Sequence, residues 1–407
     1  MSGAAGSAGV TERAQIAELQ RLEGRYAMPT YARAPVEFVR GEGCRLWDAD
    51  GKAYLDFFAG LSVHNAGHCH PRIVGAIREQ AARFGGASNL FHSEPGLRLA
   101  ERLSESSLGG RVFLANTGTE ANEAAIKLVR KHAHLRGIER PEIVVLEHAF
   151  HGRTLGALAA TPKLAREDLF GPLPEGFAIV PRDDPEALRQ AVGERTAAVM
   201  LEPIQGEAGV FPVPAEVIAA AREACDAVGA LLVFDEIQTG MGRTGSLWAY
   251  EQLPVRPDVL TAAKALGGGL PAGAVIISPR LGDGLDRGEH GSTFAGGPIV
   301  AAAALTALEV INDAELLSRV RRLGQTFRDG LAALDGVEEV RGCGLMVGVT
   351  LAPSIDAGAL ARLALEAGLV INVPGERKLR FLPPLVIGEA EVEEALAKLA
   401  SAIERAV

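Results

Sequence analysis

AAVMLEPIQGEAGVFPVPAEVIAAAREACDAVGALLVFDE, residues 197–236, holds two short apolar runs separated by a helical stretch. The runs AAVML (197–201) and ALLVF (230–234) are apolar throughout, which is typical of strands buried on both faces. Between them, PAEVIAAAREACDAVG (214–229) places apolar residues at helical intervals, starts at a proline and stops at a glycine. Two buried strands joined by a helix predict a parallel sheet with helices on its faces.

Runs of the same kind extend this sheet in both directions along the chain. They are EIVVLEH (142–148), DVLTAAK (258–264) and GAVIIS (273–278), and helical stretches alternate with them from about residue 95. We therefore expect an α/β fold with a large domain built on a mainly parallel sheet flanked by helices.

The two ends of the chain differ from this middle part. Residues 36–57 alternate apolar and polar side chains around the turn DADG, as a β-meander does, and follow a helical stretch at 11–25. After residue 300, a long Ala/Leu helix leads to EEVRGCGLMVGVTL and a final helix. We expect the meander and the C-terminal part to form a small α+β domain. The predicted organisation is a flexible tail and leading helix at 1–25, small-domain segments at 26–65 and 301–407, and the large domain at 66–300.

Composition excludes several classes of function. The 407 residues include 41 Lys and Arg against 51 Asp and Glu, a net charge of -10 that argues against a nucleic-acid partner. Four widely spaced cysteines without a CxxC motif argue against a disulfide framework or a thiolate zinc site, and favour a reducing cytoplasm. The longest apolar stretch, 298–311, falls short of the roughly 20 residues of a membrane helix. Residues 1–9 lack the features of a signal peptide.

Polar residues at the ends of the apolar runs are the candidates for a site, because ligands of open parallel sheets bind beyond the carboxyl ends of the strands. Glu202, Asp235 and Lys264 occupy such positions. Lys264 is the only charged residue between Val259 and Pro279. Apolar surroundings should lower the pKa of this lysine, and a neutral amine can form a Schiff base with an aldehyde cofactor. The alternative is a lysine that extends from a strand end into solvent.

Two further features point to the same cofactor. Asp235 ends a run of five apolar residues, where a carboxylate needs a buried cation such as a protonated pyridine nitrogen. The alternative is a carboxylate held by an arginine or by helix-end amides. In NTGTEANEAAIKLVRKHA (116–133), Thr117, Gly118 and Thr119 would offer hydroxyl and amide groups to a phosphate at a helix N-terminus, although Thr119 could be an ordinary N-cap. A nucleophilic lysine, a pyridinium partner and a phosphate cradle together predict pyridoxal 5'-phosphate.

A series of sequence strings also resembles a known family. In order along the chain they are NTGTEANEA, AFHGRT, EPIQGEAGV, FDEIQTGMGRTG, TAAKALGGGLP, HGSTFAGGP and LRFLPPLVI. Over about residues 25–405 the sequence is similar to the class III aminotransferases of pyridoxal-phosphate fold type I, and most similar to their acetylornithine aminotransferase subgroup. The resemblance implies a seven-stranded sheet in the large domain and a homodimer with a shared active site.

The resemblance implies how the cofactor is bound. It gives Lys264 the role of the Schiff-base lysine and pairs Asp235 with the pyridine nitrogen. The further contacts that it implies are a hydrogen bond to the ring oxygen from Gln238, stacking on the ring by Phe150, phosphate binding by Thr117, Gly118 and Thr119, and contact with the phosphate of the neighbouring subunit from Thr293. The string AGGP after Thr293 departs from the Gly-Gly-Asn-Pro that is usual in the family, so the geometry of that loop is left open.

The resemblance also implies a reaction. Arg153, helped by Tyr31, would bind a substrate carboxylate, and Arg380 would bind the α-carboxylate of 2-oxoglutarate. Glu207 would neutralise Arg380 while an ω-amino donor is bound. Leu61 stands where enzymes that act on free ornithine have a tyrosine, which favours an acylated donor. The expected reaction converts N2-acetyl-L-ornithine and 2-oxoglutarate into N-acetyl-L-glutamate 5-semialdehyde and L-glutamate, a step of arginine biosynthesis.

The sequence also leaves other functions open. Within the class, the donor could be succinylornithine, ornithine, 4-aminobutyrate or a carrier-bound lysine or ornithine, and a related aminomutase or decarboxylase has the same fold. GMGRTG (240–245) matches a dinucleotide fingerprint, with Asp258 as the acidic residue of a nicotinamide-dependent dehydrogenase. His64, His68 and His70 lack the convergent ligands of a metal site, so no metal is expected. A non-enzymatic binding module would not need the isolated Lys264.

Overall fold

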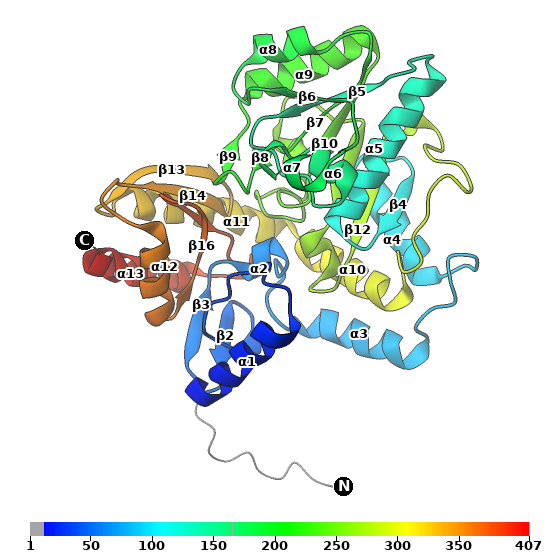
Figure 1. Ribbon diagram of the computed structural model, residues 1–407. Coiled ribbons are helices and arrows are strands. Elements are labelled where there is room, and N and C mark those ends of the chain that lie inside the picture. Colours follow the sequence, from blue (N-terminus) through cyan, green and yellow to red (C-terminus); the bar gives the residue numbers. More distant parts are fainter. Residues whose placement is uncertain (1–11, 165–166, 407) are drawn as a thin grey trace.

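The computed structural model describes residues 12–164 and 167–406, and its largest element is a seven-stranded sheet (Figure 1). The strand order is β4-β12-β11-β10-β7-β5-β6. The strands are β4 (Val112–Ala115), β5 (Glu142–Leu146), β6 (Phe177–Val180), β7 (Thr196–Leu201), β10 (Leu231–Asp235), β11 (Val259–Ala262) and β12 (Gly273–Ile277). The predicted α/β fold with a mainly parallel sheet is confirmed.

One strand of the sheet runs against the others. β12 pairs antiparallel with both β11 and β4, whereas the other pairings are parallel. Only residues 263–272 separate β11 from β12, and they contain a 3-10 turn but no α-helix. A parallel connection needs a crossover of a dozen or more residues, so this segment is long enough only for an antiparallel return. The apolar texture of GAVIIS could not indicate this direction.

Helices cover both faces of the sheet. Alternate residues of β10 pack in two separate cores: Leu231 and Val233 pack in the core that includes α5 (Gly118–Leu135), and Leu232 and Phe234 in the core that includes α9 (Ala215–Val228). This alternation explains why the central strands are apolar throughout. Helix α9 ends where the sequence predicts, with Gly229 in the left-handed conformation.

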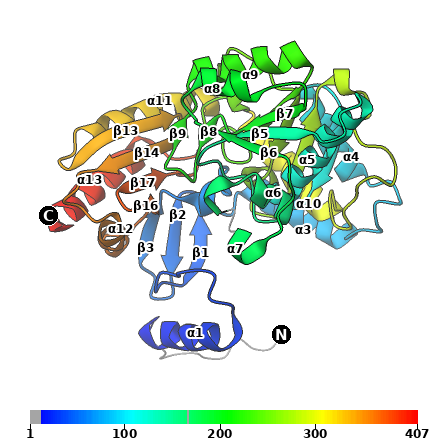
Figure 2. The same ribbon diagram turned by 45° about the horizontal axis from the view of Figure 1, so that its top comes forward.

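Two smaller sheets lie beside the large one (Figures 1 and 2). The first joins the meander β1 (Phe38–Glu42), β2 (Arg45–Asp48) and β3 (Ala53–Asp56) to β15 (Leu369–Val370). The second, here termed the C-terminal sheet, has the order β13-β14-β17-β16 and consists of β13 (Val337–Cys343), β14 (Met346–Leu351), β16 (Asn372–Gly375) and β17 (Lys378–Phe381). Segments from both ends of the chain therefore pair with each other, while the domain boundaries at residues 65 and 300 stay a prediction.

The remaining elements complete the description. The other helices are α1 (Glu12–Tyr26), α2 (Ala59–Ser62), α3 (Pro71–Arg83), α4 (Glu94–Glu105), α6 (Leu155–Ala159), α7 (Glu167–Phe170), α8 (Pro185–Ala191), α10 (Pro298–Ile311), α11 (Ala314–Ala332), α12 (Ala357–Glu366) and α13 (Glu389–Ala406). A short hairpin joins β8 (Ile204–Gln205) to β9 (Phe211–Pro212). Residue 11 of the expected leading helix and the expected tail at 1–9 lie outside the described residues. Within those that are described, no helix combines the length and the apolar character that crossing a bilayer requires.

Candidate active site

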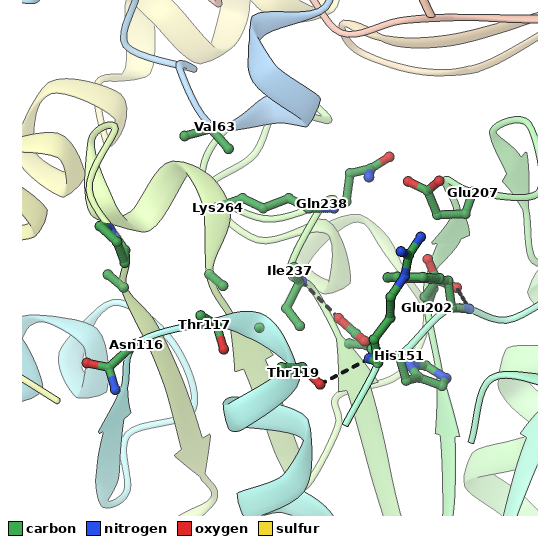
Figure 3. A pocket seen from close by; sticks show the side chains of 18 of the residues that line it. Val63, Asn116, Thr117, Thr119, His151, Glu202, Glu207, Ile237, Gln238 and Lys264 are labelled. Atoms are coloured by element: carbon green, nitrogen blue, oxygen red, sulfur yellow. Dashed lines mark hydrogen bonds and ion pairs between the residues drawn. The ribbon is translucent and has the colours of Figure 1, made fainter. Parts of the chain in front are cut away.

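A cavity of about 500 Å³ opens at the carboxyl ends of β7, β10 and β11, beside the N-terminus of α5. Figure 3 shows Lys264, Gln238 and Glu207 along one side of it and Thr117, Thr119 and His151 along the other. Its lining includes most of the residues that the sequence nominates: Thr117, Gly118, Thr119, Phe150, Arg153, Glu202, Glu207, Asp235, Gln238 and Lys264. Residues separated by up to 147 positions thus meet at one edge of the sheet, from Thr117 to Lys264.

Lys264 begins a 3-10 turn, Lys264–Gly267, two residues after β11 ends. Its backbone is left-handed, with a φ of 48°. This conformation costs a non-glycine residue roughly 1 kcal/mol or more and is often found at functional sites. The side chain is partly buried. Burial lowers the pKa of its ammonium group, and the charge of Arg380 lowers it further, while neighbouring carboxylates act in the opposite direction.

Asp235 ends β10 and is 3% exposed. Its Oδ2 accepts hydrogen bonds from Asn122 Nδ2 and His151 Nδ1, each at 2.7 Å. Its Oδ1 accepts the N–H of Ile237 at 3.1 Å. Among the described residues, no lysine or arginine forms an ion pair with this carboxylate. The sequence left open an arginine as the partner of Asp235, but the structure shows a histidine and a side-chain amide in that role.

His151 and Asn122 are the site residues that the sequence reasoning missed. Burial by itself would lower the pKa of His151, but the hydrogen bond and charge of Asp235 outweigh it and raise that pKa. Nε2 of the ring and Oδ1 of Asn122 are buried without a hydrogen-bond partner in the described part of the chain. The available signal was the position of His151 directly after Phe150, beside a residue already nominated for the cofactor.

Glu202 follows β7 and supports the wall that carries Phe150. Its Oε1 accepts the N–H of Phe150 at 2.9 Å, and Oε2 accepts the N–H of Gly206 at 3.4 Å. Burial raises the pKa of Glu202 to about 7. Phe150 itself lines the cavity, with the guanidinium of Arg153 6.0 Å from its ring centre.

The N-terminus of α5 differs in one detail from the sequence-based alternative. Thr117, not Thr119, is the N-cap, and its hydroxyl accepts the N–H of Glu120 at 3.3 Å. The Thr119 hydroxyl accepts the N–H groups of Arg153 and Thr154, each at 3.3 Å. Thr119 therefore holds the loop that carries Arg153, because it lies in the first turn of the helix and points toward that loop.

Glu207 and Arg380 form an ion pair beside the cavity, with Oε1 and Nη1 2.6 Å apart. Burial would raise the pKa of Glu207, but Arg380 outweighs burial and lowers it. The same Nη1 donates to Gln238 Oε1 at 3.3 Å. Nε and Nη2 of Arg380 donate to Asn372 Oδ1 at 3.0 and 2.8 Å, a partner with no signal in the sequence.

Besides Arg380, which lies beside the cavity, three nominated residues do not line it. Tyr31 is 66% exposed on the segment after α1. Thr293 is exposed and lines a different hollow together with Phe294 and Ala295. Leu61 is partly buried, and Val63 lines the cavity near it. Their proposed roles stay predictions.

The competing motifs find other places in the structure. GMGRTG lies in the segment after β10 that leads to a 3-10 turn at Ala249–Gln252, not to an α-helix, so it lacks the helix N-terminus of a dinucleotide site. His68 Nε2 pairs with Asp56 Oδ2 at 2.6 Å, and the ring centres of His64 and His68 lie 4.4 Å apart with their planes tilted by 35°. Within the described residues, no group of three or more His, Cys, Asp or Glu side chains is arranged to hold a metal ion.

Comparison with known proteins places this geometry in context. A family model described as aminotransferase class-III matches residues 26–403. The chain is 46% identical over 379 residues to the acetylornithine aminotransferase of Caldanaerobacter subterraneus subsp. tengcongensis, covering 92% of this chain and 96% of that protein. It is 47% identical over 390 residues to the acetylornithine aminotransferase of Xylella fastidiosa, covering 93% and 95%. The solved ornithine aminotransferase of Toxoplasma gondii, which has partial occupancy of PLP at its active site, superposes with a TM-score of 0.91 at 35% identity, covering 96% of this chain and 94% of that one.

Proposed function

Because this chain belongs to the class III aminotransferases, we propose that it transfers the ω-amino group of N2-acetyl-L-ornithine to 2-oxoglutarate. The products are N-acetyl-L-glutamate 5-semialdehyde and L-glutamate. The observation that carries the proposal is the single cavity in which Lys264 and Asp235 lie beside the Glu207–Arg380 pair. The names of the relatives support acetylornithine as the donor over the other ω-amino compounds.

The family implies pyridoxal phosphate, and the residues present fit this group. A buried carboxylate, Asp235, faces the cavity, and among the described residues its Oδ1 accepts only one backbone N–H. The N-terminus of α5 offers amide groups and the Thr117 hydroxyl to a phosphate at the other end. When bound, pyridoxal phosphate supplies the electron sink for bond cleavage at the carbon that carries the amino group.

Each side chain has a defined task in this proposal. Asp235 holds a positive charge at the ring nitrogen, and Phe150 forms one wall of the ring site. Lys264 anchors the cofactor and, with its pKa lowered, can accept a proton at Nζ from the substrate carbon and return it. The cavity wall of apolar and glycine residues around Lys264 limits access of water to that atom.

Two arginines would bind the substrates, and only Arg380 would distinguish them. Arg153 is exposed at the cavity and would bind the carboxylate that both substrates carry. The donor brings no second carboxylate to its reacting end, so Arg380 can stay paired with Glu207. The 2-oxoglutarate α-carboxylate then replaces Glu207 at Arg380. An acyl group on the donor removes the charge of its α-amino nitrogen, which suits a site that has Val63 and Leu61 near it.

We also propose that the enzyme is a cytoplasmic homodimer in which Thr293 contacts the phosphate bound in the neighbouring subunit. Large exposed apolar side chains, Leu90, Phe91 and Phe294, adjoin two hollows that both include Ala295, which favours self-association of this face. The four cysteines are free, as expected in a reducing compartment.

A donor screen tests the function. Purified protein with pyridoxal phosphate and 2-oxoglutarate is given acetylornithine, succinylornithine, ornithine or 4-aminobutyrate, and glutamate is measured. We expect the highest kcat/KM with acetylornithine, and a preference for ornithine or 4-aminobutyrate would refute the donor. Borohydride reduction and peptide mapping should place the cofactor on Lys264, and an adduct on another lysine would refute the site.

A further inference from the structure

The turn between β8 and β9, which carries Glu207, packs against the C-terminal sheet. Arg341 of β13 faces Gly348 of β14, and Gly348 faces Arg380 of β17, so the three residues form one row across neighbouring strands. Directly opposed residues of antiparallel strands project to the same face. The carbonyl oxygen of Gly209 lies over the middle of this row, because a Cβ placed on Gly348 would come within 2.5 Å of it.

Cations on both sides of Gly348 hold successive residues of this turn. Arg341 donates to the Gly209 carbonyl from Nε at 3.0 Å and from Nη2 at 2.7 Å. Lys378 donates to the Ala208 carbonyl at 3.0 Å, and Arg380 binds Glu207 itself. The turn is therefore attached to the sheet at three consecutive positions, two of them through its backbone.

An aromatic residue after the turn adds to the same attachment. The guanidinium of Arg341 lies 3.8 Å from the ring centre of Phe211, and the ammonium group of Lys378 lies 4.8 Å from it. Arg182 approaches this ring at 4.6 Å from the large-sheet side. Cations over an aromatic face are attracted by the electrons of the ring. Arg341 is 8% exposed, so its contacts with the turn are shielded from solvent.

We propose that Arg341 is a positioning residue for substrate discrimination. The absence of a side chain at Gly348 leaves room for the Gly209 carbonyl to approach the sheet and accept the hydrogen bonds of Arg341. By fixing the Gly209 carbonyl, while Lys378 holds that of Ala208, Arg341 confines the exchange at Arg380 to a rotation of the Glu207 side chain, which is 34% exposed. The turn itself stays docked. This inference rests on the proposed function, because it assigns a means of control to the Glu207–Arg380 pair.

Loosening the turn has a measurable consequence. A dicarboxylate can bind Arg380 only by displacing Glu207, so a well-positioned Glu207 weakens that binding. Without the two hydrogen bonds from Arg341 to Gly209, Glu207 should compete less well for Arg380. A dicarboxylate should then bind Arg380 more tightly. Glutarate is a suitable probe, since it has the chain length of 2-oxoglutarate but no keto group.

The experiment titrates glutarate into the cofactor-loaded enzyme by calorimetry. Glu207→Ala should tighten glutarate binding roughly tenfold, and Arg341→Met several-fold, within the range of coupling energies measured for contacting residues. In a Glu207→Ala background, Arg341→Met should produce no further change, because Arg341 acts through Glu207. Arg341→Lys, which keeps one donor for Gly209, should lie between Arg341→Met and the unchanged enzyme.

Gly348→Ala provides a second, independent variant. Its Cβ would displace the Gly209 carbonyl, so it should tighten glutarate binding in the same direction. Gly358→Ala is the matched control, because its Cβ meets no atom closer than 3.4 Å. Unchanged glutarate affinity in folded Arg341→Met and Gly348→Ala, or equal tightening with and without Glu207, would overturn the positioning role. Unchanged affinity in Glu207→Ala alone would instead overturn the proposed function of the pair, and this inference with it.

Discussion

The Oδ2 atom of Asp235 lies 2.7 Å from Nδ1 of His151, and the two side chains are 3% and 0% exposed. The pair thus forms a buried part of the cavity wall. Asp235 raises the pKa of His151, which means that the carboxylate favours the protonated, positively charged imidazole. One oxygen of Asp235 is fixed in this way, and the other faces the cavity residues around Ile237.

Replacing His151 should harm both stability and turnover. His151→Leu removes a donor from a buried carboxylate, and breaking a buried charged pair costs about 3–5 kcal/mol. Loss of a group that orients a site ligand typically costs about 10–100-fold in activity, and we expect kcat to fall by that amount. Guanidinium unfolding and steady-state kinetics measure the two effects. His151→Asn, which retains an N–H, should lose less of both, and wild-type values in His151→Leu would contradict the role.

Removing the charge of Glu207 should change the preference between amino donors. Glu207→Gln keeps the shape of the side chain but can no longer neutralise Arg380, so the guanidinium stays available to an α-carboxylate. We expect kcat/KM for glutamate as donor to rise relative to acetylornithine by roughly tenfold, the effect of about 1.4 kcal/mol. Both donors are compared in the same assay. An unchanged ratio would show that Glu207 does not control Arg380.

The sequence predicts the parts of this site that have a local signal. Lys264 and Asp235 could be nominated because each is a charged residue at the end of an apolar strand, and the strand texture itself follows from burial on both faces. His151 and Asn122 could not, because their role depends on a contact with Asp235 across 84 and 113 positions of the chain. The position of His151 directly after Phe150 indicates that it lies near the cofactor site, but it does not reveal which residue it contacts.

Strand direction, the choice of N-cap and the partner of Arg380 also have no clear pattern in the sequence. The run GAVIIS predicts a buried strand, but only the length of the segment that precedes it decides that β12 is antiparallel. Thr117 and Thr119 are equally good caps by residue type, and the structure selects Thr117. The Asn372 contact with Arg380 depends on the register of β16 and β17, which the sequence does not display.

Because the pKa of Lys264 is lowered, we expect this residue to reduce the folding stability of the cofactor-free protein in a pH-dependent way. Its pKa is lower when folded than when unfolded, so the folded state binds this proton less readily, and stability should rise with pH between the two values. Lys264→Met removes the penalty. The variant should gain stability over the unmodified protein at pH 7, and this gain should shrink as the pH approaches about 10.4, the value of a free lysine. Melting temperatures across that range test this, and a gain independent of pH would contradict the shift.

The absence of a side chain at Gly206 leaves room for the amide of Gln238. A Cβ on Gly206 would lie 2.0 Å from Gln238 Oε1, so Gly206→Ala must push this amide away from Arg380 and the ring site. Because Gln238 can move, stability should change little, by less than about 1 kcal/mol, as for other substitutions without a core defect. Affinity for the cofactor should fall about tenfold, since misplacement of a positioning group by about 1 Å is costly. Gly193→Ala, where a Cβ meets no atom within 4 Å, is the control for fluorescence titration with pyridoxal phosphate. If Gly206→Ala binds it as tightly as this control, Gln238 does not contribute to the cofactor site.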